Sequence, residues 1–380
     1  MRYLFFIVAS FFLFGCQSNG KTGHAEKTDE VMTVDNSTVI SPVYAQGYTV
    51  TYRPDGVRLV EVKDPQTSNA TSYRFALIPR GVEADAPQGY TAITVPVKRV
   101  ICMTSLQLSN FIALDACEHV AGITSTRHLF NPQMQRQLKE GQTVKIGIEG
   151  NFDNETIMAI NPDLIFISPF KRGGYEGMRD IDIPLVPHLG YKELHPLGQA
   201  EWVKFISLFM GMEKEAVERF AAIEARYNEL KDLADKVEKR PLVFSGEMRG
   251  GNWYAVGGKS FLAQLFRDAG ADYFLKDDER SGGVTLDYET VYSQAESADY
   301  WRIVNSYNGQ FSYEALRASD SRYADFRAFR EHHVLYCNMK QTPFYECMPM
   351  EPHLVLADLI HAFHPNLLPD YTPVYYSLLK

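Results

Sequence analysis

Apolar and polar positions alternate in three short runs near the start of the chain. Residues 48–52 place apolar side chains at every second position, and residues 57–62 and 73–78 are apolar runs interrupted by single charged residues. Segments rich in Pro, Asp and Gly separate the runs. A period of two is typical of a strand with one buried face, and turn residues between such runs favour antiparallel pairing. The pattern therefore predicts an N-terminal antiparallel β extension.

From Val97 the pattern changes to short apolar runs that alternate with amphipathic segments. Such alternation is typical of a parallel α/β sheet. It is interrupted at Glu213–Val237, where apolar residues recur every three or four positions and predict one helix of about 37 Å. Before this helix we expect strands 99–102, 120–123 and 163–167 with helices 106–116 and 154–160, and after it strands 242–244, 301–304 and 334–336 with helices 260–269, 286–294 and 353–363.

The first residues form a separate segment. An apolar run from Leu4 to Phe14 follows one Arg and ends at Gly15-Cys16. It has the length of a signal-peptide core and is too short to span a membrane. The pattern resembles a bacterial lipobox, which implies cleavage before Cys16 and a lipid on its sulfur. The alternative is a cleaved secretory signal with an incidental cysteine. The polar segment from Gln17 reads as a flexible spacer.

Composition excludes several classes of function. The chain is 45% hydrophobic and 22% charged, which suits a globular protein, and its net charge of −9 gives no basic surface for nucleic acid. No nucleophile elbow, His-Glu-x-x-His or P-loop sequence is present, so we expect a protein that is not an enzyme and has no cofactor. The cysteines lack the compact spacing of a metal site, and we expect no bound metal.

Four cysteines follow Cys16. An even number in an oxidising compartment permits disulfides, and the ten-residue separation of Cys337 and Cys347 is compatible with a bridge. The connectivity of Cys102, Cys117, Cys337 and Cys347 stays open.

Three segments resemble the class III substrate-binding proteins of ABC importers, which take up ferric siderophores, haem and cobalamin. Residues 147–163 are similar to the family motif Glu-x-Ile-x-x-Leu-x-Pro-Asp, with Ile160 in place of Leu. Residues 252–265 resemble its glycine-rich turn and following helix, and residues 352–365 resemble its closing helix, with His353 in place of Asp.

The resemblance implies an α/β fold of two Rossmann-like lobes, each a central β-sheet flanked by helices, bridged by one long rigid α-helix behind the N-terminal β extension. The expected division is a lipoprotein signal peptide at 1–15, a flexible tether at 16–45, an N-terminal lobe at 46–198, a linking helical segment at 199–238 and a C-terminal lobe at 239–380.

Ligands of α/β folds collect beyond the carboxyl ends of strands and at domain interfaces. The residues at these places are aromatic and cationic, which suits a flat or chelated ligand with carboxylates. Ordinary packing is the alternative for Trp253 and Tyr254, and a solvated loop tip is the alternative for Lys171 and Arg172. The predicted ligand-binding residues are Met103, Thr104, Ser105, Phe170, Lys171, Arg172, Tyr175, Arg249, Trp253, Tyr254, Tyr307 and Tyr345.

The resemblance also implies a function. We expect a monomeric periplasmic lipoprotein, tethered to a membrane, that passes an iron complex to an inner-membrane ABC permease. The alternatives are a cobalamin-binding protein of the same class and a haem-scavenging or sensory lipoprotein without its own permease. Family members dock through one glutamate in each lobe, and the matching residues here are Glu155 and Glu289. Helix N-terminal charge pairing is the alternative for both acids, and the two roles are compatible.

Overall fold

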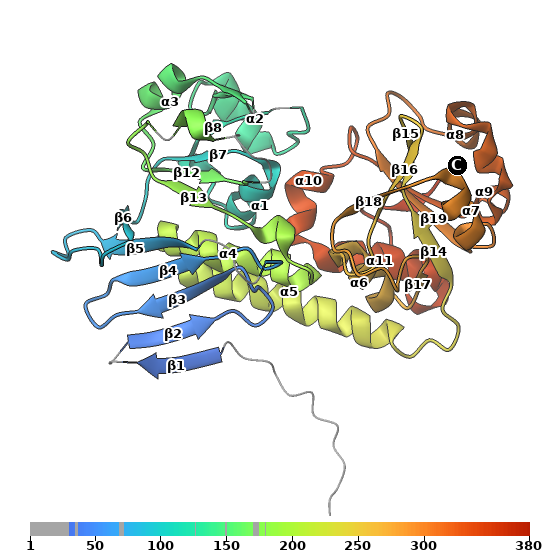
Figure 1. Ribbon diagram of the computed structural model, residues 1–380, viewed down its shortest axis with the longest axis horizontal. Coiled ribbons are helices and arrows are strands. Elements are labelled where there is room, and N and C mark those ends of the chain that lie inside the picture. The colour runs from blue at the N-terminus through green and yellow to red at the C-terminus, as the bar shows by residue number, and fades with distance from the viewer. Residues whose placement is uncertain are drawn as a thin grey trace, which may run out of the picture.

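The computed structural model describes residues 30–34, 37–67, 72–125, 127–148, 150–169, 175–178 and 180–380. These residues form an N-terminal sheet, a first α/β lobe, two linking helices and a second α/β lobe (Figure 1). The predicted signal peptide and Cys16 lie outside them. Among the described residues, no helix is both long enough and apolar enough to cross a bilayer.

The N-terminal sheet has six strands in sequence order. Neighbouring strands pair antiparallel, except that the last two pair in parallel. The three strands predicted from alternation are confirmed as β3, β4 and β5. Residues 16–45 were expected to form a flexible tether. Within this range, residues 30–34 and 37–41 instead form β1 and β2, which join the sheet through backbone pairing. The strands are β1 (Glu30–Val34), β2 (Ser37–Ser41), β3 (Tyr48–Tyr52), β4 (Arg58–Val62), β5 (Tyr73–Pro79) and β6 (Thr91–Val95).

The first lobe is built on a parallel sheet of five strands in the order β13-β12-β7-β8-β9. Every residue of β7, β8 and β12 is buried, as expected where helices cover both faces of a parallel sheet. The predicted strand–helix alternation is therefore confirmed. The elements are β7 (Val100–Cys102), α1 (Ser105–Ala113), β8 (Val120–Ile123), α2 (Pro132–Lys139), β9 (Val144–Lys145), the hairpin β10 (Gly147–Ile148) and β11 (Asn151–Phe152), α3 (Asn154–Ile160), β12 (Leu164–Ile167) and β13 (Leu185–Pro187).

Two helices link the lobes. The long helix predicted from periodicity is α5 (Glu213–Ala234), and its 22 residues span about 33 Å. It packs against α4 (Pro196–Met210) on one side and against α11 (Pro352–Phe363) of the second lobe. The chain reverses between α4 and α5 at Gly211, whose φ of +69° is a left-handed conformation that glycine adopts without a steric cost. It also contacts the first lobe, because Arg219 donates through Nε to the carbonyl oxygen of Ala113 at the end of α1 at 2.9 Å. Because α5 thus contacts both lobes, it restricts how far they can move apart.

The second lobe has a five-stranded sheet in the order β17-β14-β19-β20-β21, parallel except for β21. A small antiparallel sheet, β15-β16-β18, was not predicted, because its strands are short and the glycines beside them indicated a turn. The strands are β14 (Leu242–Ser245), β15 (Glu247–Arg249), β16 (Asn252–Val256), β17 (Asp272–Tyr273), β18 (Gly283–Leu286), β19 (Tyr300–Asn305), β20 (Val334–Asn338) and β21 (Ser377–Leu378). The helices before α11 are α6 (Phe261–Asp268), α7 (Tyr288–Ala295), α8 (Tyr313–Ser319), α9 (Arg327–Arg330) and α10 (Phe344–Cys347).

The four cysteines of the described residues are free thiols, so the disulfides that the sequence permits do not form among them. Cys102, Cys117 and Cys337 are buried and Cys347 is half-buried. Burial raises the pKa of Cys117 and of Cys337 to about 12. These thiols therefore stay protonated and unreactive at neutral pH.

Candidate functional site

A crevice lies between the two lobes. Its central cavity has a volume of about 420 Å³, inside the range of roughly 300–1,000 Å³ that is common for small-molecule sites. This cavity shares Thr104 and Ser105 with a chamber in the first lobe and shares Tyr345 with a chamber in the second lobe. The central cavity therefore adjoins both chambers. The central cavity is lined by Thr104, Ser105, Leu106, Ser168, Tyr191, Gln199, Phe261, Tyr345, Met348 and Pro349.

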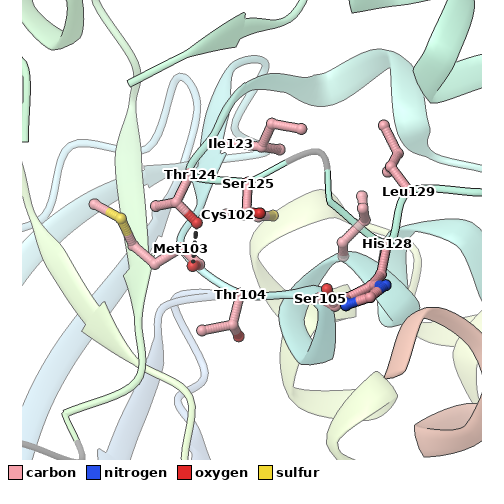
Figure 2. A pocket seen from close by; sticks show the side chains of 10 residues that line it. Cys102, Met103, Thr104, Ser105, Ile123, Thr124, Ser125, His128 and Leu129 are labelled. Atoms are coloured by element: carbon pink, nitrogen blue, oxygen red, sulfur yellow. Dashed lines mark hydrogen bonds between the residues drawn. The ribbon is translucent and has the colours of Figure 1, made fainter. Parts of the chain in front are cut away.

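The first-lobe chamber, of about 230 Å³, lies beyond the carboxyl ends of β7 and β8 (Figure 2). Met103, Thr104 and Ser105 follow β7, and Thr124 and Ser125 follow β8. The hydroxyl of Thr124 donates a hydrogen bond to the carbonyl oxygen of Met103 over 2.8 Å. This bond joins the segments that follow β7 and β8, both of which line the chamber.

A buried glutamine fixes the loop that carries Thr104. The Oε1 atom of Gln107 accepts hydrogen bonds from the backbone N–H groups of Met103 and Thr104 at 2.6 and 3.0 Å. Its Nε2 donates to Ser168 Oγ at 2.8 Å. Gln107 is the third residue after Thr104, which is the spacing of a capping box at a helix N-terminus. Because Ser168 follows β12, one side chain holds two strand ends in place before a ligand arrives.

His128 also lines the first-lobe chamber, and its imidazole is directed toward Ser105 (Figure 2). Burial and the nearby Arg127 lower the pKa of His128, so the imidazole is neutral at neutral pH. A neutral imidazole can both donate and accept a hydrogen bond. Within the described ranges, no group of three or more His, Cys, Asp and Glu side chains could hold a metal ion.

The second-lobe chamber, of about 220 Å³, contains charged groups. Arg249 Nη2 lies 2.6 Å from Glu247 Oε1, and the other Glu247 oxygen accepts a bond from Asn305 Nδ2 at 3.4 Å. Arg302 donates through Nε to the hydroxyl of Tyr376 at 2.9 Å. Two guanidinium groups held by their neighbours can form charge-assisted hydrogen bonds with ligand carboxylates.

Adjacent residues of β16 face opposite ways, as a strand requires. Tyr254 is 47% exposed and lines the second-lobe chamber. Trp253 is completely buried, and its indole N–H donates to the carbonyl oxygen of Ser245 at 2.9 Å. Its ring lies 5.7 Å from that of Trp301 in the lobe core. The ligand contact predicted for Trp253 is therefore wrong in this structure, and the packing alternative holds for its side chain.

Of the other predicted tyrosines, one lines the cavities and two do not. Tyr345 is 50% exposed and lies where the central cavity meets the second-lobe chamber. Tyr307 packs against Phe311 with ring centroids 4.9 Å apart, and it does not line the three cavities. Tyr175 does not line these cavities either, but its hydroxyl donates to the carbonyl oxygen of Ser168, a residue of the central cavity, at 3.3 Å. The predicted residues Phe170, Lys171 and Arg172 lie outside the described residues.

Several lining residues carry no signal in the sequence. Arg302 belongs to the middle of β19, whereas the rule for strand ends selects only residues that follow a strand. Gln199 lies on α4, and Phe261 and Met348 belong to segments whose approach to the first lobe depends on how the lobes pack. His128 was one of ten scattered histidines, and no spacing signal distinguished it.

Glu155 and Glu289 occupy matching places in the two lobes. Each is exposed in the first turn of a helix, α3 or α7, whose N-cap residue is Asp153 or Asp287. In both helices the aspartate accepts a hydrogen bond from the backbone N–H three residues later, at 2.9 and 2.7 Å. The aspartates therefore already cap these helices, and both glutamates are accessible from solvent.

The sequence matches the model of one protein family. The model described as periplasmic binding protein matches residues 100–340, which include most of both lobes and begin after the N-terminal sheet. An uncharacterized lipoprotein of Methanocaldococcus jannaschii is 26% identical, over 78% of this chain and 74% of the relative. A second uncharacterized lipoprotein of that organism is 24% identical, over 79% of this chain and 78% of the relative.

Solved structures share the fold. A periplasmic haem-binding protein from Pseudomonas aeruginosa is 19% identical with a TM-score of 0.58, over 75% of this chain and 99% of that chain. The TroA-like periplasmic binding protein FepB from Veillonella parvula is 18% identical with a TM-score of 0.56, over 76% and 96%. The molybdate-bound protein MolA from Haemophilus influenzae is 17% identical with a TM-score of 0.58, over 73% and 89%. The two-lobe fold is thereby confirmed.

Proposed function

Because the chain belongs to the family of periplasmic binding proteins, which bind substrates and are not enzymes, we propose that it is the receptor of an ABC importer. It captures an iron complex, either a ferric siderophore or haem, in the crevice between its lobes. It then delivers the complex to a permease in the inner membrane.

The crevice is the observation that carries this proposal. Its central cavity of about 420 Å³ opens between a hydroxyl-rich first-lobe chamber and a charged second-lobe chamber. Tyr345 offers a half-exposed ring for stacking, and Arg249 and Arg302 offer guanidinium groups for carboxylates. The haem-binding relative from Pseudomonas aeruginosa supports this ligand class, whereas molybdate-bound MolA illustrates that the fold alone does not select a ligand.

Calorimetric titration with haemin, a ferric hydroxamate siderophore and cyanocobalamin tests the proposal. We expect one iron complex to bind, and Tyr345→Ala to weaken it roughly 2- to 10-fold, the effect of losing about 0.5–1.5 kcal/mol of stacking. Tyr307→Ala removes a tyrosine outside the three cavities and should leave the affinity unchanged. If none of the three compounds binds, the proposal fails.

Two alternative functions share the same site. The apolar side chains of Phe261 and Met348 in the central cavity could face a corrin ring, so cobalamin remains the second candidate ligand. Binding of cyanocobalamin alone in the titration would select it. A haem-scavenging or sensory lipoprotein would bind haemin and yet support no ABC-dependent uptake.

Docking to the permease involves Glu155 and Glu289 in this proposal. Exposed carboxylates contribute little energy singly, but two placed on two lobes can steer the encounter and fix its register. The double variant Glu155→Ala with Glu289→Ala should abolish uptake of the radiolabelled iron complex while the calorimetric affinity stays unchanged. A loss of affinity would place these carboxylates in the ligand site instead.

We propose that the protein is a monomer held at the periplasmic side of a membrane by a lipid on Cys16. The names of the two archaeal relatives support a lipoprotein. Cys16→Ser should release the protein from the membrane fraction, and light scattering of the released protein should give the mass of one chain. Retention of the variant in the membrane fraction would contradict the anchor.

A further inference from the structure

A buried carboxylate of the second lobe accepts hydrogen bonds from the backbone of the first lobe. Glu346 lies on α10 and is 2% exposed. Its Oε2 accepts a hydrogen bond from the backbone N–H of Phe130 at 2.9 Å, and both oxygens lie within 3.1 Å of the backbone nitrogen of Asn131. Asn131 is the N-cap residue of α2. In Figure 1, α10 lies between the lobes beside α1, with which it also packs.

Crevice residues adjoin this contact on both sides. Tyr345 precedes Glu346 in the sequence and lines two of the cavities, and Met348 follows two positions later in the wall of the central cavity. On the other side, His128 lines the first-lobe chamber two residues before Phe130. A displacement of the Glu346 carboxylate would therefore change the distance between the two crevice walls.

Stability alone does not explain an ionised group at this place. Burial raises the pKa of Glu346, and its hydrogen bonds with the two backbone N–H groups offset only part of that effect. A raised carboxyl pKa means that ionisation is less favourable in the folded chain than in the unfolded chain, so the ionised group lowers stability above that pKa. Its charge-assisted hydrogen bonds do, however, impose a defined geometry on the two segments that they join.

We propose that Glu346 is a latch that sets the width of the ligand crevice by holding α10 against the N-terminus of α2. It is a positioning residue, because its side chain is buried away from the cavities and acts through Tyr345 and His128 on either side. This inference rests on the proposed function only in taking the crevice as the ligand site.

Hydrogen exchange measured by mass spectrometry on the full chain without ligand tests the latch. Glu346→Gln removes the charge, and Glu346→Asp keeps the charge but shortens its reach by one methylene group. We expect the Phe130 and Asn131 amides to exchange roughly 10- to 100-fold faster, the effect of losing one hydrogen bond to a charged group. Circular dichroism and a thermal scan establish that each variant is folded.

Asp358→Asn is the matched control. Asp358 is also completely buried, and it accepts hydrogen bonds from the backbone N–H groups of Val374, Tyr375 and Tyr376 at 2.6–2.9 Å, but both sides of this contact belong to the second lobe. Its substitution should speed exchange at residues 374–376 and leave the amide of Phe130 unchanged.

Haemin titrations followed by absorbance complete the test. Both Glu346 variants should weaken haemin binding several-fold, whereas Asp358→Asn should not. Unchanged exchange at Phe130 in both variants, or equal acceleration there in the control, overturns the latch. If wild-type protein does not bind haemin, that ligand assignment fails, and the exchange data alone still decide whether the latch exists.

Discussion

Replacing Glu201 by alanine should detach the segment between β2 and β3 of the N-terminal sheet from α4. Glu201 is completely buried. Its Oε2 accepts hydrogen bonds from the backbone N–H groups of Tyr44 and Ala45 at 2.8 and 2.9 Å, and its Oε1 accepts one from Val43 at 3.2 Å. Lys204 Nζ also lies 2.8 Å from Oε1. One carboxylate thus partners three consecutive backbone donors and a cation.

The expected loss follows from these contacts. A hydrogen bond to a charged group contributes about 1.5–3 kcal/mol, but the contributions do not add, because water reaches part of the vacated site. Removing one partner from a buried charged network costs about 3–5 kcal/mol in total, and we expect a loss in that range. Complete unfolding is not expected, because Glu193 separately accepts hydrogen bonds from the backbone N–H groups of Gln46 and Gly47, each at 3.0 Å.

Urea unfolding followed by circular dichroism measures the loss, and limited proteolysis shows whether the chain near Tyr44 becomes accessible. Glu229→Ala is the control, because Glu229 forms an exposed ion pair with Arg226 at 2.6 Å and should cost less than about 1 kcal/mol. A loss below about 1 kcal/mol for Glu201→Ala would refute the reasoning.

Two further predictions concern stability. Burial lowers the pKa of His188 to about 3 from 6.5, so as pH falls through this window the unfolded chain binds a proton that the folded chain does not. Stability should therefore decrease toward acid by up to about 1.4 kcal/mol per pH unit, and urea midpoints of His188→Gln should show a shallower acid slope; equal slopes would contradict this. Gly246→Ala should cost more than about 1 kcal/mol in urea unfolding, because at a φ of +103° its new Cβ would lie 2.0 Å from the carbonyl oxygen of Tyr254. Gly282→Ala meets open space and should leave the midpoint unchanged.

The sequence predicted much of the fold because periodicity is a local property. The parallel strands of both lobes are nearly continuous apolar runs, and α5 shows a clear helical repeat from Glu213 onward. The strands β15, β16 and β18 were missed, because only pairing across the chain distinguishes such short segments from a glycine-rich turn. The strands β1 and β2 were likewise missed, because only their pairing with the sheet distinguishes them from the predicted flexible tether.

Prediction of the site was less complete. The rule for strand ends selected Thr104 and Ser105, which line the crevice, since a strand end is visible in the sequence. The same rule selected Trp253 together with Tyr254, although neighbouring residues of one strand cannot face the same cavity. Arg302 gave no signal, because its access to the chamber depends on where β19 lies in the folded sheet.

The sequence by itself determined the class of fold, the order of its elements and the family, because each of these is written in local patterns and short motifs. The tertiary structure decided which side chains share the crevice and how its walls are held. Glu346 meets Phe130 across 216 positions of sequence, and Glu201 meets Tyr44 across 157. Contacts at such separations depend on how whole lobes and sheets pack, which the period of a strand or helix does not encode.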